Sequence, residues 1–593
     1  MSKWMVAAKR ADFNAISQKY NISPVLARII RNRDVIDDED IRKFLNGTLE
    51  DLYAPAQMKD MSKAVDILID KIEQGKKIRI IGDYDIDGIC STYILYKGLT
   101  SCGADVDTAI PHRMKDGYGL NEHLIQEAYE AGTDTVLTCD NGIAAMSQID
   151  YANELGMTVI ITDHHEVPYE EKEGRRNYLI PKAAAVVDPK QEDCSYPFPE
   201  ICGAVVAYKL VLELVARKKG YTWKDTMYSD LGQELLEFAA FATIGDVMEL
   251  KDENRIIVKY GLELMKNTRN IGLKALIDAT GTAPDNIKPY TIGFVLGPCL
   301  NATGRLDTAM NALELFQTTE KSEAAIIAGN LKSMNDSRKE LTIEGTELAI
   351  EQVEKNGLEK DRVLVIYLPE VHESLAGIIA GRIREKYGKP TFVLTKGEEG
   401  VKGSGRSIDT FHMYDEMTKC KELFTKYGGH KLAAGLSLEE QNVELFRKTI
   451  NDNCTLTDED FEEKVLIDVP MPMEYASMDF IHELDKLEPF GNGNPKPLFA
   501  QKQLKFMRGR VLGANRNVGK YTVADEKDKI YDLIYFGDIE SFNSYISDKY
   551  GQDKLGELYN VGGKDIELSV IYYPDINEFR GNVSVQMVMK YYQ

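Results

Sequence analysis

The sequence predicts an α/β protein: a parallel-sheet domain, joined by long helices to a smaller α/β domain, and then a β-barrel. Three observations lead to this prediction. Helix-like segments alternate with short apolar, β-branched runs between residues 60 and 250, as in a parallel sheet covered on both faces. Residues 309–356 are rich in Ala, Glu, Leu and Lys and contain no Pro, which favours long helices. After residue 463 a helical piece ends at PFGNGNPKP (489–497), and strand-like runs with turn signals fill the rest of the chain.

The N-terminal half divides into two predicted parts. Residues 1–55 mix short helical patterns with charge, and we expect them to form an N-terminal cap. Residues 56–308 form the first α/β domain. Its expected strands each follow a helix-like segment, and they are KIRIIG (77–82), DTVLTC (134–139) and MTVIIT (157–162).

The C-terminal half divides into three predicted parts. A chain of 593 residues is expected to contain several domains, which agrees with this division. Residues 309–358 form the connecting long helices. Residues 359–456 form the second α/β domain, with RVLVIYL (362–368) and PTFVLT (390–395) as strands on either side of a helix. Residues 457–593 open with the acidic run TDEDFEE and then form the barrel or a sandwich.

Composition excludes several classes of protein. The chain is 43% hydrophobic and 28% charged, which rules out disordered, collagen-like and fibrous proteins. Its eight cysteines contain no C-x-x-C pair, so neither a disulfide framework nor a structural zinc site is expected, and we predict a cytoplasmic location. No signal peptide and no membrane span are expected. The net charge of −23 argues against a protein that coats nucleic acid, but not against a local basic groove.

Acidic residues follow three of the expected strands. Asp83, Asp85 and Asp87 follow the first, Asp140 the second, and Asp163-His164-His165 the third. The carboxyl ends of parallel strands form one rim where ligands bind, so these segments should converge. Carboxylates with some imidazole suit Mg²⁺ or Mn²⁺, and two such ions are a standard arrangement for attacking phosphodiesters.

Each of these segments also has a structural interpretation. DYDIDG could open a calcium loop, although its twelfth position is Ile94 instead of Glu. Asp140-Asn141-Gly142 could be a hairpin turn, and Asp246, after EFAAFATIG, could be a helix-end group. The two histidines could be structural. Because adjacent side chains on extended backbone point in opposite directions, we predict that His164 is a ligand and that His165 contacts substrate or orients a partner.

Four motifs occur in the order that the DHH phosphoesterase superfamily shows: DYDIDG (83–88), TCDNG (138–142), TDHH (162–165) and TIGD (243–246). Further segments resemble its RecJ branch, the single-strand-specific exonucleases. They are PHRMKDGYGLN (111–121), GPCLNATGRLD (297–307), KGSGRS (402–407) and FTKYGGHKLAAG (424–435). The resemblance implies a DHH domain, a DHH-associated domain and an OB-like nucleic-acid-binding barrel.

The resemblance also implies the ligands. Two Mn²⁺ or Mg²⁺ ions would be held by five residues, with Asp140 bridging and Asp83 beside them: Asp85, Asp87, Asp140, His164 and Asp246. Many superfamily members have a histidine at the position of Ile81, and members of the RecJ branch lack it, as this chain does. The ligand set of the first metal therefore stays open. His165 would stabilise the non-bridging phosphate oxygens.

Further residues are candidates for binding the substrate. His430, in the GGH segment, would donate to a phosphate, or it could be a structural histidine in a turn. Substrate phosphates, including a terminal 5′-phosphate, would be bound by Arg113, Arg305, Ser404 and Arg406, any of which could instead form a surface salt bridge. Residues 501–520 contain six basic and no acidic residues, with Phe506 and Tyr521 interleaved, as expected for a barrel that stacks bases, although a solvated face is the alternative.

These features predict a 5′→3′ exonuclease that releases mononucleotides from single-stranded DNA in recombination and repair. The resemblance supplies this polarity. The expected partners are single-stranded DNA, single-strand-binding protein and a helicase, and the expected state is a monomer. A DHH phosphodiesterase acting on short oligoribonucleotides or cyclic dinucleotides is the alternative, and deleting the chain from about residue 465 should leave its activity intact. A non-catalytic replication scaffold is the other alternative.

Overall fold

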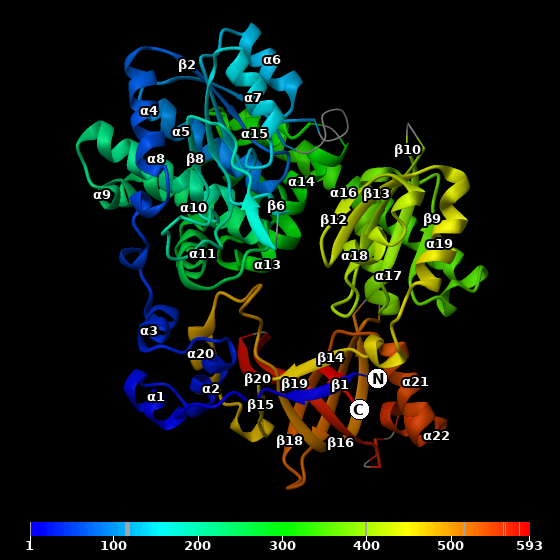
Figure 1. Cartoon of the computed structure of the whole chain (residues 1–593). Coiled ribbons are helices and arrows are strands. Elements are labelled where there is room, and N and C mark those ends of the chain that lie inside the picture. Colours follow the sequence, from blue (N-terminus) through cyan, green and yellow to red (C-terminus); the bar gives the residue numbers. More distant parts are fainter. Residues whose placement is uncertain are drawn as a thin grey trace. The chain divides into compact units, whose positions relative to one another are not determined.

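The computed structural model describes residues 2–112, 119–172, 174–306, 308–397, 400–513, 516–560, 562–563, 565–579 and 581–593. The chain forms two compact units (Figure 1). One unit combines Met1–Leu52 and Glu249–Ile256 with Lys464–Gln593, and the other contains Tyr53–Met248 and Ile257–Glu463. We call the first the barrel unit and the second the two-lobed unit, and each is described by itself.

The first lobe of the two-lobed unit is built on a five-stranded parallel sheet, as the alternating pattern predicts. Four of its strands are short and largely buried, as in a sheet covered on both faces, whereas the edge strand β3, with sequence DVDTA, is polar and partly exposed. Their order across the sheet is β3 (Asp105–Ala109), β2 (Lys77–Ile81), β4 (Thr135–Cys139), β5 (Thr158–Thr162) and β8 (Ala185–Val187).

Helices cover both faces of this sheet (Figure 1). On one face α6 (Glu122–Glu130) and α7 (Met146–Glu154) pack against strand side chains in one apolar core. On the other face α5 (Ile86–Ser101) and α8 (Gly203–Lys219) pack against each other and against β4. Helix α10 (Asp230–Gly245) packs on both α5 and α8, so its C-terminal end is fixed relative to the sheet.

Helices dominate the rest of this lobe and its connection. Helix α14 (Gly297–Leu306) packs against α16 (Lys321–Lys355), a single helix of 35 residues. The expected long connecting helix is therefore confirmed. The second lobe has a sheet in the order β12 (Phe424–Gly429), β13 (Ala433–Leu438), β11 (Gly400–Arg406), β10 (Thr391–Gly397) and β9 (Leu364–Tyr367). Only β9 and β10 are parallel in it, and α17 (Ala376–Tyr387) packs on β10 and β11.

The barrel unit joins the two ends of the chain. Strand β1 (Lys3–Val6) pairs with β14 (Lys464–Ile467), and Arg33 donates two hydrogen bonds, of 2.7 and 3.2 Å, to the buried Asp468 carboxylate. Helices α2 (Pro24–Asn32) and α3 (Asp38–Asn46) contribute to the same apolar core as the barrel strands. The N-terminal helices are therefore part of this core and not a separate cap on it.

The predicted barrel is present and closed. Its strands run β16-β17-β18-β20-β19, and β19 pairs back onto β16. They are β16 (Phe499–Leu512), β17 (Val518–Ala524), β18 (Ile530–Tyr535), β19 (Glu567–Phe579) and β20 (Asn582–Tyr592). The tail is not all β, however, because α21 (Ile539–Tyr550) and α22 (Gln552–Asn560) lie between β18 and β19. In the part of the chain that the structure describes, no helix is both long and apolar enough to span a membrane.

Candidate active site

The strand order places a ligand site at one edge of the first lobe. The chain leaves β2 toward β3 on one side and returns to β4 on the other, so the connections diverge at the carboxyl ends of β2 and β4. Such a switch point is where open parallel sheets bind ligands. Asp83 follows β2 and Asp140 follows β4 at this point.

The loop after β2 holds its carboxylates by backbone hydrogen bonds. Asp85 is the N-cap of α5, and its Oδ1 accepts from the N–H groups of Asp87 (2.9 Å) and Gly88 (3.1 Å). The calcium-loop interpretation is wrong, because the helix begins at Ile86 and position 94 lies inside it, fully buried. The short spacing in DYDIDG therefore reflects a helix cap.

The Asp87 carboxylate lies at the N-terminus of α8. Its oxygens accept from the N–H groups of Gly203 (2.6 Å) and Ala204 (2.8 Å), which favours negative charge there. Position 203 has no room for a side chain, since a β-carbon would lie 2.8 Å from Asp140 Cβ and 3.1 Å from Asp87 Oδ2. Gly203 thus lets the helix end approach two carboxylates at once.

Asp140 adopts left-handed backbone conformation, with φ of 60°, at the end of β4. It is not in a hairpin, because both neighbours of β4 run parallel to it. Asn141 fixes the turn by donating to the carbonyl oxygens of Ile81 (3.3 Å) and Cys139 (3.0 Å). The strained backbone turns the 2% exposed Asp140 side chain into the site.

The two histidines do not point in opposite directions, and that part of the prediction is wrong. Their ring centroids are only 4.5 Å apart. The strand β5 ends at Thr162, so the alternation of extended backbone does not continue through positions 164 and 165. His164 Nε2 lies 3.1 Å from Asp140 Oδ1, 3.4 Å from Asp87 Oδ2 and 3.9 Å from Asp246 Oδ2. His165 Nδ1 lies 2.7 Å from Asp163 Oδ1 and 4.0 Å from Asp140 Oδ1.

Burial, followed by the crowding of the carboxylates, disfavours their charged forms. Burial raises the pKa of Asp83 to about 7, and the charge of Asp85 acts in the same direction. At the end of α10, burial followed by the charges of Asp87 and Asp85 raises the pKa of Asp246 to about 8. Burial also raises the pKa of Asp140 well above its ordinary value. Bound cations would relieve this repulsion.

The donor atoms fall into three overlapping groups, in each of which they lie within 4.8 Å of one another. The groups are Asp83, Asp85 and Asp140; Asp140, His164 and His165; and Asp87, His164 and Asp246. Asp83 Oδ2 and His164 Nδ1 are buried without a hydrogen-bond partner among the described residues. Burial lowers the pKa of His164, which keeps its ring neutral, as a metal ligand must be. Groups of carboxylates with some imidazole fit Mn²⁺ or Mg²⁺.

Two further aspartates support this site: Asp163, which the sequence places on the same rim without giving it a role, and Asp188, which was not predicted. Asp163 accepts hydrogen bonds from the N–H groups of Ile143 and His164 and from the His165 ring. Burial alone would raise the pKa of Asp163, but the His165 bond and charge lower it, and the same bond raises the pKa of His165 to about 9 against the effect of burial. Asp188, fully buried directly after β8, has its pKa raised to about 8 by burial and then by Asp163. Both follow parallel strands, the same signal that identified the others.

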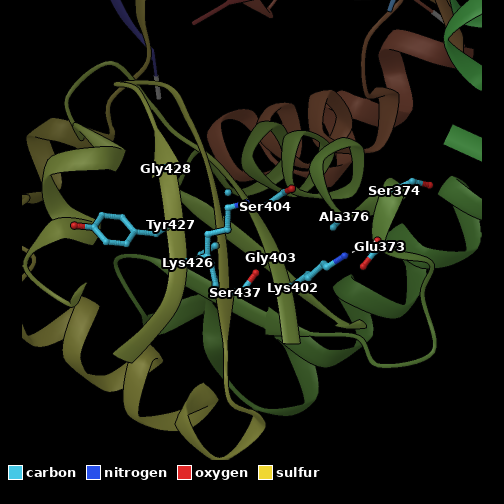
Figure 2. A pocket seen from close by; sticks show the side chains of 12 residues that line it. Glu373, Ser374, Ala376, Lys402, Gly403, Ser404, Lys426, Tyr427, Gly428 and Ser437 are labelled. Atoms are coloured by element: carbon cyan, nitrogen blue, oxygen red, sulfur yellow. Dashed lines mark hydrogen bonds and ion pairs between the residues drawn. The ribbon is translucent and has the colours of Figure 1, made fainter. Parts of the chain in front are cut away.

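The second lobe contains a separate cavity of about 400 Å³ (Figure 2). Ser404 lines it on β11, and a β-carbon at Gly377, in the first turn of α17, would lie 2.8 Å from Arg406 Nη2 and 3.5 Å from Ser404 Cβ. The structure therefore brings Ser404 and Arg406 together at a helix N-terminus. Lys402 in this cavity pairs with Glu373 at 3.0 Å.

The structure does not place the other predicted phosphate ligands in this cavity or does not describe their side chains. The His430 side chain is exposed beyond the end of β12 and is not among the residues that line the cavity. Arg113 lies outside the described residues. The backbone of Arg305 belongs to α14, but its side chain lies outside the described part of the structure.

The barrel corrects the role expected for its aromatic residues. Phe506 and Tyr521 are fully buried in the apolar core, with ring centroids 5.5 Å apart, so neither can stack on a base. Four of the six basic residues between 501 and 520 are exposed, namely Lys502, Arg508, Arg510 and Arg516. Lys520 pairs with Asp532 at 2.8 Å. The basic face is present without the aromatic one.

Comparison with known proteins agrees with this architecture. Three family models match in order: the DHH family N-terminal domain at residues 77–243, the DHHA1 domain at 360–455 and the RecJ OB domain at 467–591. The single-stranded-DNA-specific exonuclease RecJ of Bacillus subtilis is 33% identical over 593 residues, which are 99% of this chain and 70% of that protein. The enzyme of the same name from Escherichia coli is 30% identical over 583 residues, covering 96% and 95%.

Solved structures are similar to the whole chain. The crystal structure of RecJ in complex with Mn²⁺ from Thermus thermophilus matches with a TM-score of 0.80 and 26% identity, covering 100% of this chain and 79% of that one. The structure of RecJ in complex with Mg²⁺ from the same organism matches with a TM-score of 0.75. Both fold and domain order are therefore shared.

Proposed function

Because the chain belongs to the RecJ family of single-stranded-DNA-specific exonucleases, we propose that it degrades single-stranded DNA from the 5′ end and releases 5′-mononucleotides. It is a metal-dependent nuclease that uses Mn²⁺ or Mg²⁺. The observation that carries the proposal is the set of three overlapping donor groups, in which Asp140 belongs to two. A carboxylate shared between two sets of ligands would be able to serve two cations.

The residues of the site have separable roles in hydrolysis. Asp87, His164 and Asp246 would hold one cation and Asp83 and Asp85 the other, with Asp140 between them. When bound, the two ions supply an activated water and neutralise charge on the phosphate oxygens. His165, with a pKa of about 9, is a cation at neutral pH, and its 42% exposed side chain can donate to a non-bridging oxygen. Asp163 orients that ring.

The 5′ polarity is supported by the second lobe. Ser404 and Arg406 meet at the N-terminus of α17, where a hydroxyl, a guanidinium and backbone N–H groups suit a terminal phosphate. A phosphate bound there would let the chain begin cleavage only at a 5′ end. Arg113, Arg305 and His430 remain proposed contacts to the same substrate.

Action in recombination and repair, in the cytoplasm and as a monomer, is part of this proposal, as are single-strand-binding protein and a helicase as partners. The free state of the eight cysteines supports a reducing compartment. The strand that enters the site must already be single, so an upstream reaction that separates the duplex has to supply it.

The alternative of a small-substrate phosphodiesterase requires a different test from the deletion considered above. Residues 22–45 share one core with the barrel strands, so truncation at residue 465 would leave Leu26 and Ile30 without their packing partners. The loss of activity after that truncation would therefore say little about substrate. A scaffold without catalysis is disfavoured by the complete set of donor residues.

The test is digestion of single-stranded DNA labelled at either end, with Mn²⁺ or with EDTA. We expect immediate release of the 5′ label as a mononucleotide, abolished by EDTA and reduced at least about a thousandfold by Asp140→Asn. Asn tolerates the left-handed backbone at position 140, so this substitution removes charge without changing the turn. Asp150→Asn, at an exposed position on α7, is the matched control.

Release of the 3′ label first would contradict the polarity. Cleavage of short oligoribonucleotides alone would favour the small-substrate enzyme, and no cleavage at all the scaffold.

A further inference from the structure

Two aromatic side chains stack on each other at the surface of the first lobe. The rings of Tyr290 and Phe294 have centroids 4.8 Å apart and planes 23° apart. Tyr290 is 68% exposed and Phe294 is 66% exposed. Their spacing of four residues on helical backbone puts both on one side of the helix. Large aromatic rings are usually well buried, so this pair leaves an unusual flat aromatic surface open to a ligand.

The backbone beneath the pair is a π-helical turn. Residues Ile292–Leu296 form this turn between α13 (Pro289–Thr291) and α14. π-helical turns are rare and are frequently found at functional sites. Ile292 and Leu296 are fully buried, so the turn is anchored from below while the aromatic rings face outward.

The same turn is connected to the metal site by direct packing. It packs against α10, the helix that ends at Asp246. A β-carbon at Gly297 would lie 2.8 Å from Ile86 Cδ1, and one at Gly245 would lie 2.6 Å from Ile86 Cγ2. Ile86 is the residue between Asp85 and Asp87. The aromatic pair and the carboxylates therefore belong to one continuous set of packed contacts.

The charge next to this segment is mainly positive. Cys299, in the first turn of α14, accepts a hydrogen bond of 3.4 Å at its Sγ from Asn335 on α16. Within four residues of Asn335 on the same helix lie three cations and one carboxylate, namely Lys332, Asp336, Arg338 and Lys339, and Glu340 follows them. Asp336 pairs with Lys332 at 2.5 Å. A polyanionic strand is therefore better suited to this side of the lobe than a basic protein surface.

We propose that Tyr290 and Phe294 form a stacking platform for a nucleobase of the single-stranded substrate. This inference rests on the proposed function and names a residue pair that positions the strand for it. Base–aromatic stacking is independent of sequence, because every base has a π-face. It also requires an unpaired base whose face is free, so the platform would favour single strands over duplex. The carboxylates act on phosphate, and the platform would hold the base.

The proposal is tested by binding measured without cleavage. Fluorescence anisotropy in EDTA would compare two oligonucleotides of equal length and charge, one with bases and one with a run of abasic sites. We expect Tyr290→Ala/Phe294→Ala to weaken binding about tenfold for the first and not at all for the second. The swapped variant Tyr290→Phe/Phe294→Tyr should bind both like the native chain. Tyr221→Ala, which removes another 62% exposed aromatic, should also change nothing.

Two results would overturn the platform: equal affinity of the double variant and the native chain for the base-containing strand, or equal loss on both strands. The first result would mean that the aromatic pair does not contact bases and is available for a protein partner. The second would mean that the substitutions disturb the fold or the phosphate contacts. The proposed function fails separately, if native protein with Mn²⁺ releases no nucleotide from single-stranded DNA. The binding contrast in EDTA decides the platform in either case.

Discussion

The parallel sheet of the first lobe and the barrel strands place functional side chains in different ways. In the sheet, the candidate ligands Asp83 and Asp140 and the supporting Asp163 come after the strands, in the loops at their carboxyl ends. In the barrel, five of the six basic residues between 501 and 520 lie within strands, where alternate side chains point to opposite faces. Lys520 is therefore partly exposed while Tyr521 next to it is fully buried. In the sheet, the order of the strands decides where the functional side chains lie. In the barrel, the alternation of side chains along each strand decides which of them are exposed.

The strongest way to break this comparison is to shorten an aromatic side chain in the barrel. Phe506→Ala should lower the free energy of unfolding of the barrel unit by about 3–5 kcal/mol, because it leaves a cavity in a packed core. The measurement is urea unfolding followed by circular dichroism. Phe506→Leu keeps most of the volume, so it should retain both most of the stability and native affinity for single-stranded DNA. A folded Leu variant with weakened DNA binding would mean that this ring contacts bases after all.

The next largest effect should come from His165 at the rim of the sheet. His165→Gln should lower kcat about a hundredfold, as loss of one donor to a developing charge does. With a pKa of about 9, the native His165 ring is protonated at neutral pH and loses its proton as the pH rises through 9, so activity should fall there. Asp163→Asn removes the negative charge that raises this pKa and leaves only a neutral acceptor for the ring N–H, so the fall should then begin at lower pH.

The control for that pH profile is His123→Gln, which changes an exposed histidine on α6. Rates between pH 6 and 10 with Mg²⁺ give the measurement. If native protein and His165→Gln lose activity at the same high pH, another group is responsible for the alkaline limb.

A smaller effect at the same rim tests how closely the backbone must approach. Gly203→Ala should weaken Mn²⁺ binding and activity about 10- to 100-fold, because the new methyl group would press on both Asp140 and Asp87. Calorimetric titration with Mn²⁺ measures the affinity. Gly329→Ala is the control, since position 329 on α16 has no heavy atom within 4 Å of its β-carbon position among the described residues. There we expect unchanged activity and a gain of about 0.5–1 kcal/mol in stability. Native Mn²⁺ affinity in Gly203→Ala would show that the loops adjust.

The sequence is sufficient for the parts of the molecule that local pattern and topology determine. The alternation of helices with apolar strands predicts the parallel sheet, and the aspartates after its strands are brought together as expected. The N–H groups of Gly203 and Ala204 donate to Asp87, which lies 116 and 117 residues before them in the sequence. The sequence of α8 alone does not predict these hydrogen bonds. The prediction for His165 assumes extended backbone at positions 164 and 165, but β5 ends at Thr162. The core shared by residues 22–45 and the barrel is likewise a long-range fact.

The smallest expected effect concerns the basic face of the barrel and would sharpen the comparison most directly. Arg508 and Arg510 are exposed on β16, while Phe506, before the irregular register between 506 and 508, points into the core. Arg508→Ala/Arg510→Ala should weaken single-stranded DNA binding only a few-fold and leave stability unchanged, because exposed charges contribute little to folding. Its distinctive signature is the salt dependence: the slope of log K against log[salt] should fall by about 0.7 for each phosphate that the variant no longer neutralises. Lys19→Ala/Lys549→Ala removes two exposed charges of the same unit outside β16 and should preserve the slope. If both double variants have the native slope, the exposed arginines of β16 are only a solvated surface. If only the arginine variant lowers the slope, the basic side chains on the exposed face of β16 contact the phosphate backbone of the substrate.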